Sequence, residues 1–142
     1  MVQHPPLPPA LRVCFAGFYA YGALVHLANM LGWAGIDWRV APLKWQALDL
    51  IYLALDLAIV LGLWTGRRWA VPAVCVAALS QIALYTLLRD WILDVPAAVA
   101  ISAADRAYLN GLVAFHIACL AVIGGVFWRH QLRSRRGARG RA

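Results

Sequence analysis

Hydrophobic residues in this chain gather into four long runs that are separated by short polar stretches. The runs cover about residues 11–31, 46–65, 69–88 and 107–128. A helix needs ~20 apolar residues to cross a hydrocarbon core about 30 Å thick, and each run has about that length. We therefore predict four membrane-spanning helices, the last of them extended to about 103–129, that pack as an all-α four-helix bundle.

The residues around the runs support these boundaries. Pro72 would lie in the first turn of the third helix, where its missing N–H breaks no helical hydrogen bond. Ser102 followed by Asp105 resembles a capping box, which marks the beginning of a helix. Both features predict helix starts close to where the hydrophobic runs begin.

The connections between the predicted helices differ in length. The second and third helices are joined only by residues 65–68, whereas the connections at about 32–45 and 89–106 are longer. We expect each longer connection to contain a short amphipathic piece that lies in the membrane interface. Residues 1–142 would then form a single transmembrane domain that ends in a basic tail at 130–142.

The composition agrees with a membrane protein. The chain is 63% hydrophobic and 13% charged, whereas soluble domains are about half apolar and about a quarter charged. Arginine and lysine together number 13, and all but Lys44 are arginine. This bias, together with abundant alanine, favours a bacterial inner membrane.

The charges predict an orientation. One side of the membrane would carry nine arginines and no acid: Arg12, Arg67, Arg68, Arg129, Arg133, Arg135, Arg136, Arg139 and Arg141. The other side would carry four basic residues, which are Arg39, Lys44, Arg89 and Arg106, balanced by Asp37, Asp90, Asp94 and Asp105. The positive-inside rule then places both termini in the cytoplasm. The seven tryptophans lie near predicted helix ends, as in an aromatic belt.

The basic tail and the cysteines define the expected partners. An arginine-rich tail next to a membrane favours contact with anionic lipid, or control of topology, over a nucleic-acid arm. Cys14, Cys75 and Cys119 fall inside predicted helices and form no CxxC motif, so we expect small packing residues and no disulfide framework. The expected partners are the lipid bilayer and other membrane subunits or further copies of this chain.

Two carboxylates interrupt the second hydrophobic run. Asp49 and Asp56 are seven residues apart, which is two helical turns, and Tyr52 lies between them on the same face. An Asp near the centre of a membrane helix is unfavourable by ~2.5–3.5 kcal/mol. This face must therefore point into the bundle, because lipid offers it no hydrogen-bond partner.

Each of the other predicted helices also carries polar residues on one face. His26 lies late in the first helix, His116 lies inside the fourth, and the third carries polar residues every four positions: Gln81, Tyr85 and Arg89. With alternating helix directions, these groups and the acids of the second helix converge in the outer half of the membrane. An acid beside a histidine in a low dielectric is typical of proton relays and ligand sites.

Other interpretations of these residues stay open, namely a structural role, a haem site and a metal site. Any one of them could simply bond a neighbouring helix, which would contribute ~0.6 kcal/mol. His26 and His116 are the ligand type that a b-type haem uses. A metal site of His26, His116 and Asp56 is less favoured, because no HxxxH or ExxH spacing accompanies them.

The turn between the second and third helices resembles one known family. The segment GLWTGRRWAV contains Gly62, Leu63, Thr65 and Arg67, which match the Gly-Leu-x-Thr-Arg type turn of the DoxX-like group of small bacterial membrane proteins. Gly66 is inserted before the arginine, and the matching acid is Asp49 or Asp56. The resemblance implies an association with membrane redox complexes, including quinone-linked ones.

We therefore expect a small accessory or ligand-binding component of a quinone-linked membrane redox system, with a polar pocket in the outer half of the bundle. No nucleophile elbow, P-loop or dinucleotide fingerprint occurs in the sequence, so it is not expected to be an enzyme on its own. Two alternatives are a purely structural subunit or assembly factor and a proton-coupled transporter of small molecules. The candidate site residues are Asp56, His26, His116, Asp49, Tyr52, Gln81, Tyr85 and Arg89.

Overall fold

The fold is all-α, as the sequence predicts. A computed structural model describes residues 7–33, 37–96 and 101–139, and this part of the chain contains helices and loops but no strand. The elements are α1 (Pro9–Met30), the 3₁₀ helix η1 (Trp38–Val40), α2 (Leu43–Trp64), α3 (Ala70–Thr86), α4 (Arg89–Leu93) and α5 (Ala103–Arg139). Parts of the predicted outer connections, of the proline-rich N-terminus and of the basic tail lie outside the described residues.

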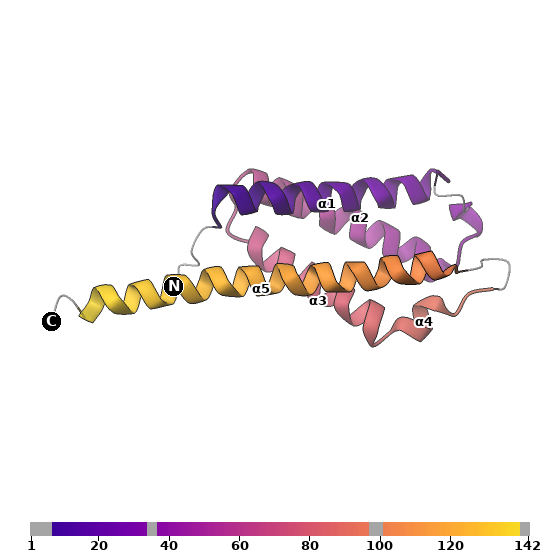
Figure 1. Cartoon of the computed structure of the whole chain (residues 1–142). Coiled ribbons are helices and arrows are strands. Elements are labelled where there is room, and N and C mark those ends of the chain that lie inside the picture. The colour runs from indigo at the N-terminus through magenta and orange to yellow at the C-terminus, as the bar shows by residue number, and fades with distance from the viewer. Residues whose placement is uncertain (1–6, 34–36, 97–100, 140–142) are drawn as a thin grey trace.

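The long helices run side by side along one direction (Figure 1). α1 packs on α2, α2 on α3, and α3 on α5. The start of α1, the turn between α2 and α3 and the far end of α5 lie at one end of the array, which we call the basic end (Figure 1). The other end carries η1, α4 and the start of α5 (Figure 1), and we call it the loop end.

Among the residues that the structure describes, three helices are long and apolar enough to cross a membrane, namely α1, α2 and α5. The third predicted span, 69–88, is instead a shorter apolar helix of 17 residues that stops at Thr86. Contacts from α2 account for the stop, because Lys44 Nζ bonds the carbonyls of Trp91 and Asp94. Trp45 Nε1 also donates to the Ile92 carbonyl at 2.9 Å. These bonds hold α4 against the start of α2, so the chain turns there.

The last helix is longer than predicted. We expected it to end near 129 and to be followed by a tail, but α5 continues to Arg139 and spans 37 residues. Arginine is a good helix former, so loss of hydrophobicity ends the apolar run without ending the helix. Its start agrees with the predicted capping box, because the Asp105 N–H donates to Ser102 Oγ at 3.1 Å and the Ser102 N–H to Asp105 Oδ2 at 2.8 Å.

The basic end of the array is filled by an apolar core. Small side chains of α3 let the neighbouring helices approach closely, and Val74 and Ala77 are completely buried there. Around them pack buried residues from the other long helices, including Phe15 of α1, Ile59 of α2 and Ile123 of α5. A pocket of about 240 Å³ lies beside this core, lined by residues that include Arg12, Leu63 and Trp64.

The turn between α2 and α3 is fixed by an arginine from α1. Arg12 donates to the Leu63 carbonyl from Nε at 3.0 Å and from Nη2 at 2.7 Å, and Nη2 also reaches the Trp64 carbonyl at 3.2 Å. These carbonyls belong to the last turn of α2, where the helix leaves them without partners of its own. Gly66 follows with φ +67°, a conformation that favours glycine, which explains the glycine between Thr65 and Arg67.

Candidate functional site

A cavity of about 320 Å³ lies among α1, α2, α3 and α5 toward the loop end. Seven of the eight candidate residues line it, and these are His26, Asp49, Tyr52, Asp56, Gln81, Tyr85 and His116. The eighth, Arg89, does not line it. The helices therefore bring polar residues that are up to 90 positions apart to the wall of one cavity.

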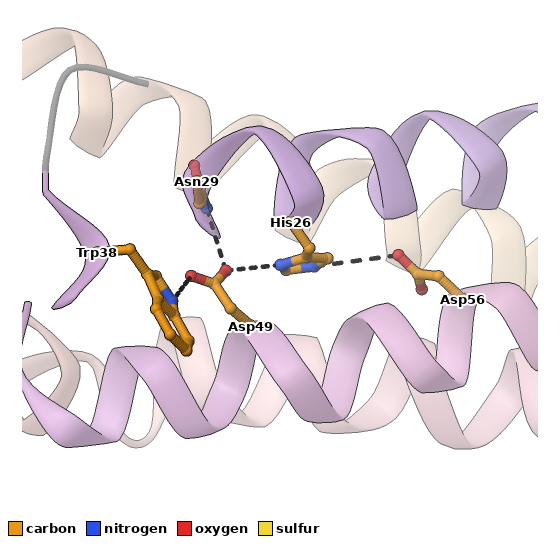
Figure 2. A network of polar contacts seen from close by, with 5 residues as sticks. All are labelled: His26, Asn29, Trp38, Asp49 and Asp56. Atoms are coloured by element: carbon orange, nitrogen blue, oxygen red, sulfur yellow. Dashed lines mark hydrogen bonds and ion pairs between the residues drawn. The ribbon is translucent and has the colours of Figure 1, made fainter. Parts of the chain in front are cut away.

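Asp49 is the best-bonded side chain in this cavity (Figure 2). Its Oδ1 accepts hydrogen bonds from His26 at 2.8 Å and from Asn29 at 3.0 Å. Its Oδ2 accepts one from Trp38 Nε1 at 3.1 Å. Three donors from α1 and η1 thus converge on one carboxylate of α2, which holds the ends of these elements together.

His26 lies between two carboxylates, with one on each side of its ring (Figure 2). Its Nδ1 bonds Asp49, and its Nε2 lies 4.0 Å from Asp56 Oδ2. An ionised carboxylate can only accept hydrogen bonds, so His26 Nδ1 donates to Asp49 and carries the proton in the neutral ring. Nε2 is then left facing Asp56, and the three side chains form a row from η1 into the interior.

Asp56 is the most deeply placed acid of this row. It is only 2% exposed, and it packs directly against the backbone of Gly22 in α1. A methyl group at Gly22 would lie 2.4 Å from Asp56 Oδ2, which is too close for real atoms. Glycine at this position therefore makes room for the carboxylate, whose other oxygen, Oδ1, has no hydrogen-bond partner.

Two more buried side chains leave a polar atom without a partner. Gln81 of α3 is 7% exposed and His116 of α5 is fully buried, and neither Gln81 Oε1 nor His116 Nε2 is bonded. The other ring nitrogen of His116 bonds the Leu112 carbonyl at 2.7 Å. A buried polar group without a partner is unfavourable by ~1–3 kcal/mol, so three of them at one cavity are not explained by packing.

The remaining candidate residues have more ordinary surroundings. Tyr52 donates to Ser80 Oγ at 3.1 Å, and its ring stacks beside His26 with ring centroids 5.9 Å apart. Tyr85 packs in a small apolar cluster with Leu84 and Tyr52. Arg89 bonds Asn110 at 2.6 Å in an exposed position, so it ties α4 to α5 outside the cavity.

Aromatic rings make up much of the remaining wall. Phe18, Tyr19, Trp45 and Tyr108 line the cavity together with the tyrosines already described. Phe18 of α1 stacks on Phe115 of α5 with ring centroids 3.7 Å apart, and its edge contacts His116. Of the described residues that line the cavity, none is lysine or arginine. The cavity is therefore aromatic and acidic, with histidine as its basic side chain.

The geometry also bears on the haem and metal alternatives. Both ring nitrogens of His26 face carboxylates, so ligation of a haem iron by His26 and His116 together would require His26 to leave them. Across the part of the chain that the structure describes, no group of three or more His, Cys, Asp or Glu side chains is placed to hold a metal ion. Of the four ring nitrogens of this pair, His116 Nε2 is the one with neither an acid nor a carbonyl as a partner.

Some contributors to the site were not among the candidates drawn from the sequence. Trp38 lies in a connecting segment, where no periodicity reports which way a side chain points. Gly22 lies on the same helical face as His26, and that spacing was the signal that could have identified it. Ser80 bonds Tyr52 and the Ala77 carbonyl, and only the contact between α2 and α3 reveals its part.

Comparison with models of protein families, with characterised proteins and with solved structures gave no match in any of the three searches.

Proposed function

We propose that this protein binds an amphipathic small molecule of the quinone class inside the membrane, as an accessory component of a redox system. The observation that carries the proposal is the group of three buried atoms without partners, Asp56 Oδ1, Gln81 Oε1 and His116 Nε2. They come from three different helices, and all three residues line one cavity. A ligand head group that bonds them would remove the unfavourable desolvation that each now carries.

The row of Asp49, His26 and Asp56 supports a role in proton exchange. Asp56 is the member at the cavity that also has a free oxygen, and His26 stands between it and Asp49. When two electrons leave a bound quinol for an electron acceptor of the redox system, Asp56 can take one of the two protons released and pass it to His26 Nε2, while Asp49 stabilises the charged ring and the second proton goes to water. Reduction and oxidation of a quinone move protons together with electrons, so a site of this kind suits that class of ligand.

The resemblance of the Gly62–Arg67 turn to the DoxX-like group points in the same direction. In that group, membrane redox complexes are among the partners. The acid of this chain that would correspond to the family's acid is Asp49 or Asp56.

We further propose a membrane placement. The chain would cross a bacterial inner membrane four times as a four-helix bundle, with α3 as the shortest span, and a short span is accommodated by local thinning of the bilayer. The arginines at the basic end of the array, namely Arg12, Arg67, Arg68, Arg129, Arg133, Arg135 and Arg136, would face the cytoplasm. The cavity then opens toward the outer half of the membrane.

Extraction of bound lipids tests the proposed ligand class. The protein is purified in detergent, and its organic extract is analysed by mass spectrometry beside that of Asp56→Asn and of Asp90→Asn, an exposed acid away from the cavity. We expect a quinone or quinol in the extracts of the native protein and of Asp90→Asn, and a several-fold lower amount with Asp56→Asn. Equal amounts in all three extracts, or a haem Soret band in the absorption spectrum, would contradict the proposal.

A further inference from the structure

The three unpartnered atoms at the cavity share one property, which is that each is a hydrogen-bond acceptor. Gln81 Oε1 is an amide oxygen. His116 Nδ1 bonds a backbone carbonyl at 2.7 Å, and because a carbonyl only accepts, Nδ1 carries the proton of the neutral ring. His116 Nε2 is therefore the unprotonated nitrogen, and it accepts.

Asp56 Oδ1 is also an acceptor, because the other oxygen of the carboxyl group faces His26. Its Oδ2 faces His26 Nε2 at 4.0 Å, so a proton held between these two groups lies on the Oδ2 side of the carboxyl. Oδ1 is left as an acceptor whether the proton belongs to the acid or to the ring. Three residues that line the cavity, one each from α2, α3 and α5, thus carry an acceptor without a partner.

We infer that the cavity is built for a ligand whose aromatic head group donates at least two hydrogen bonds through hydroxyl groups, so it takes a quinol in preference to the corresponding quinone. The inference rests on the proposed function and deepens it. A quinone offers only carbonyl oxygens, which would face Gln81 Oε1 and His116 Nε2 as acceptor against acceptor. A quinol places an O–H against each of them.

The rest of the wall agrees with this choice. Arginine and lysine would be the strongest donors to a quinone carbonyl, and neither occurs among the described residues that line the cavity, where neutral groups such as the hydroxyls of Tyr85 and Tyr108 are the donors. The rings of Phe18, Tyr19 and Tyr52 give an aromatic head group flat surfaces to pack against. The preference therefore comes from the polar atoms, while the aromatic wall accepts either redox form.

A matched set of three ligands tests the inference. Decyl-substituted benzoquinol, the corresponding benzoquinone and the dimethyl ether of the quinol are titrated anaerobically into the purified protein, with tryptophan fluorescence as the readout, because Trp45 lines the cavity. The ether keeps the shape of the quinol and loses both donors. We expect the quinol to bind at least tenfold more tightly than either of the others.

The outcomes distinguish the preference for a donor ligand from the proposed binding of a quinone-class molecule. Equal or tighter binding of the quinone, or equal binding of the ether, would overturn the donor inference while leaving a quinone-class site. Binding of none of the three ligands would overturn the proposed function itself. Tighter binding of decylamine than of the quinol would also overturn the inference, because it would assign the acceptors to an ammonium group.

Two variants locate the effect. Gln81→Met keeps the length of the side chain and removes its acceptor, and His116→Phe keeps a ring and removes the free nitrogen. Each should reduce the preference for the quinol over its ether several-fold, while Cys119→Ala, in the apolar core of the basic end, should leave it unchanged. Thermal unfolding is measured for every variant, and an unchanged preference in a well-folded Gln81→Met protein would contradict the inference.

Discussion

The ring of His26 is held by Asp49, with Nδ1 and Oδ1 2.8 Å apart. Because Asn29 and Trp38 bond the same carboxylate, Asp49 has little freedom to turn away from the ring. It therefore fixes both the direction of the imidazole and the nitrogen that carries its proton, which is the usual role of a carboxylate behind a functional histidine. Asp49 and Asp56 share one helical face, yet only Asp56 has a buried oxygen without a hydrogen-bond partner.

The first prediction concerns the stability of the protein when Asp49 is changed. Asp49→Asn puts an NH₂ group where an oxygen now accepts, so a donor faces either Trp38 or the pair of His26 and Asn29. We expect the free energy of unfolding to fall by ~1–3 kcal/mol. The measurement is thermal unfolding in detergent, and an unchanged midpoint would contradict the network.

The second prediction is the opposite result at Asp56. Asp56→Asn keeps the size of the side chain and removes a possible buried charge, so stability should stay the same or rise. Oxidation of a bound quinol by added ferricyanide, which takes electrons but no proton, should nevertheless become slower, because an amide cannot take the proton that leaves the hydroxyl. Stopped-flow measurement of the rate of proton release during this oxidation checks this. A variant that unfolds early yet releases protons at the native rate would reverse the roles assigned to Asp49 and Asp56.

A third prediction uses two glycines of the same helix. Gly22→Ala places a methyl group 2.4 Å from Asp56 Oδ2, so it should displace the carboxylate and weaken ligand binding by an order of magnitude or more. Gly17→Ala is the matched control, because a methyl group there meets nothing within 4 Å. It should stabilise the helix by up to about 1 kcal/mol and leave binding unchanged. Similar effects of both changes would mean that Gly22 matters only through helix propensity.

The fourth prediction addresses the turn at the basic end. Arg12→Lys removes the forked contact with the carbonyls of Leu63 and Trp64, and a lysine cannot reproduce it. We expect a loss of about 1–2 kcal/mol in the free energy of unfolding. Arg68→Lys, at an exposed position, should change stability by less than about 0.5 kcal/mol. Ligand binding should be unaffected by either change, since the turn lies at the end of the array away from the cavity.

The fifth prediction tests the orientation. In a variant whose native cysteines are replaced by alanine, a single cysteine at exposed Thr65 should react with a membrane-impermeant maleimide only after the cells are opened. A single cysteine at exposed Ala104 should react from outside in intact cells. Labelling of the Thr65 position from outside, with the Ala104 position protected, would invert the proposed topology.

Helical periodicity explains why much of the site could be predicted from the sequence. The spacing of Asp49, Tyr52 and Asp56 fixes one face, and the cost of an acid in lipid forces that face inward. What spacing does not contain is the rotation of one helix against another. The pairing of His26 with Asp49, and the free ring nitrogen of His116, depend on that rotation and appear only in the folded chain.

The errors in the helix boundaries have a common physical origin. The run 69–88 contains no charged residue, so nothing local marks the stop at Thr86, which contacts from Lys44 and Trp45 to α4 bring about. At the C-terminal end of α5, the arginines from 129 onward end the apolar pattern, but they are good helix formers, so the helix continues. Hydrophobicity therefore located the apolar segments, and long-range contacts and helix propensity set the actual ends.

The helix α5 is long and nearly straight, and it runs from the wall of the cavity past the basic end of the array (Figure 1). His116 lies at the cavity, and Arg136 lies twenty residues further along one uninterrupted helix, so the two are separated by ~30 Å. A tilt of about 5° around His116 would move the Arg136 end by ~2.6 Å, from the rise of a helix per residue. A ligand that pushed on the His116 wall would therefore change the position of a positively charged surface far from the cavity, without any rearrangement within the helix itself.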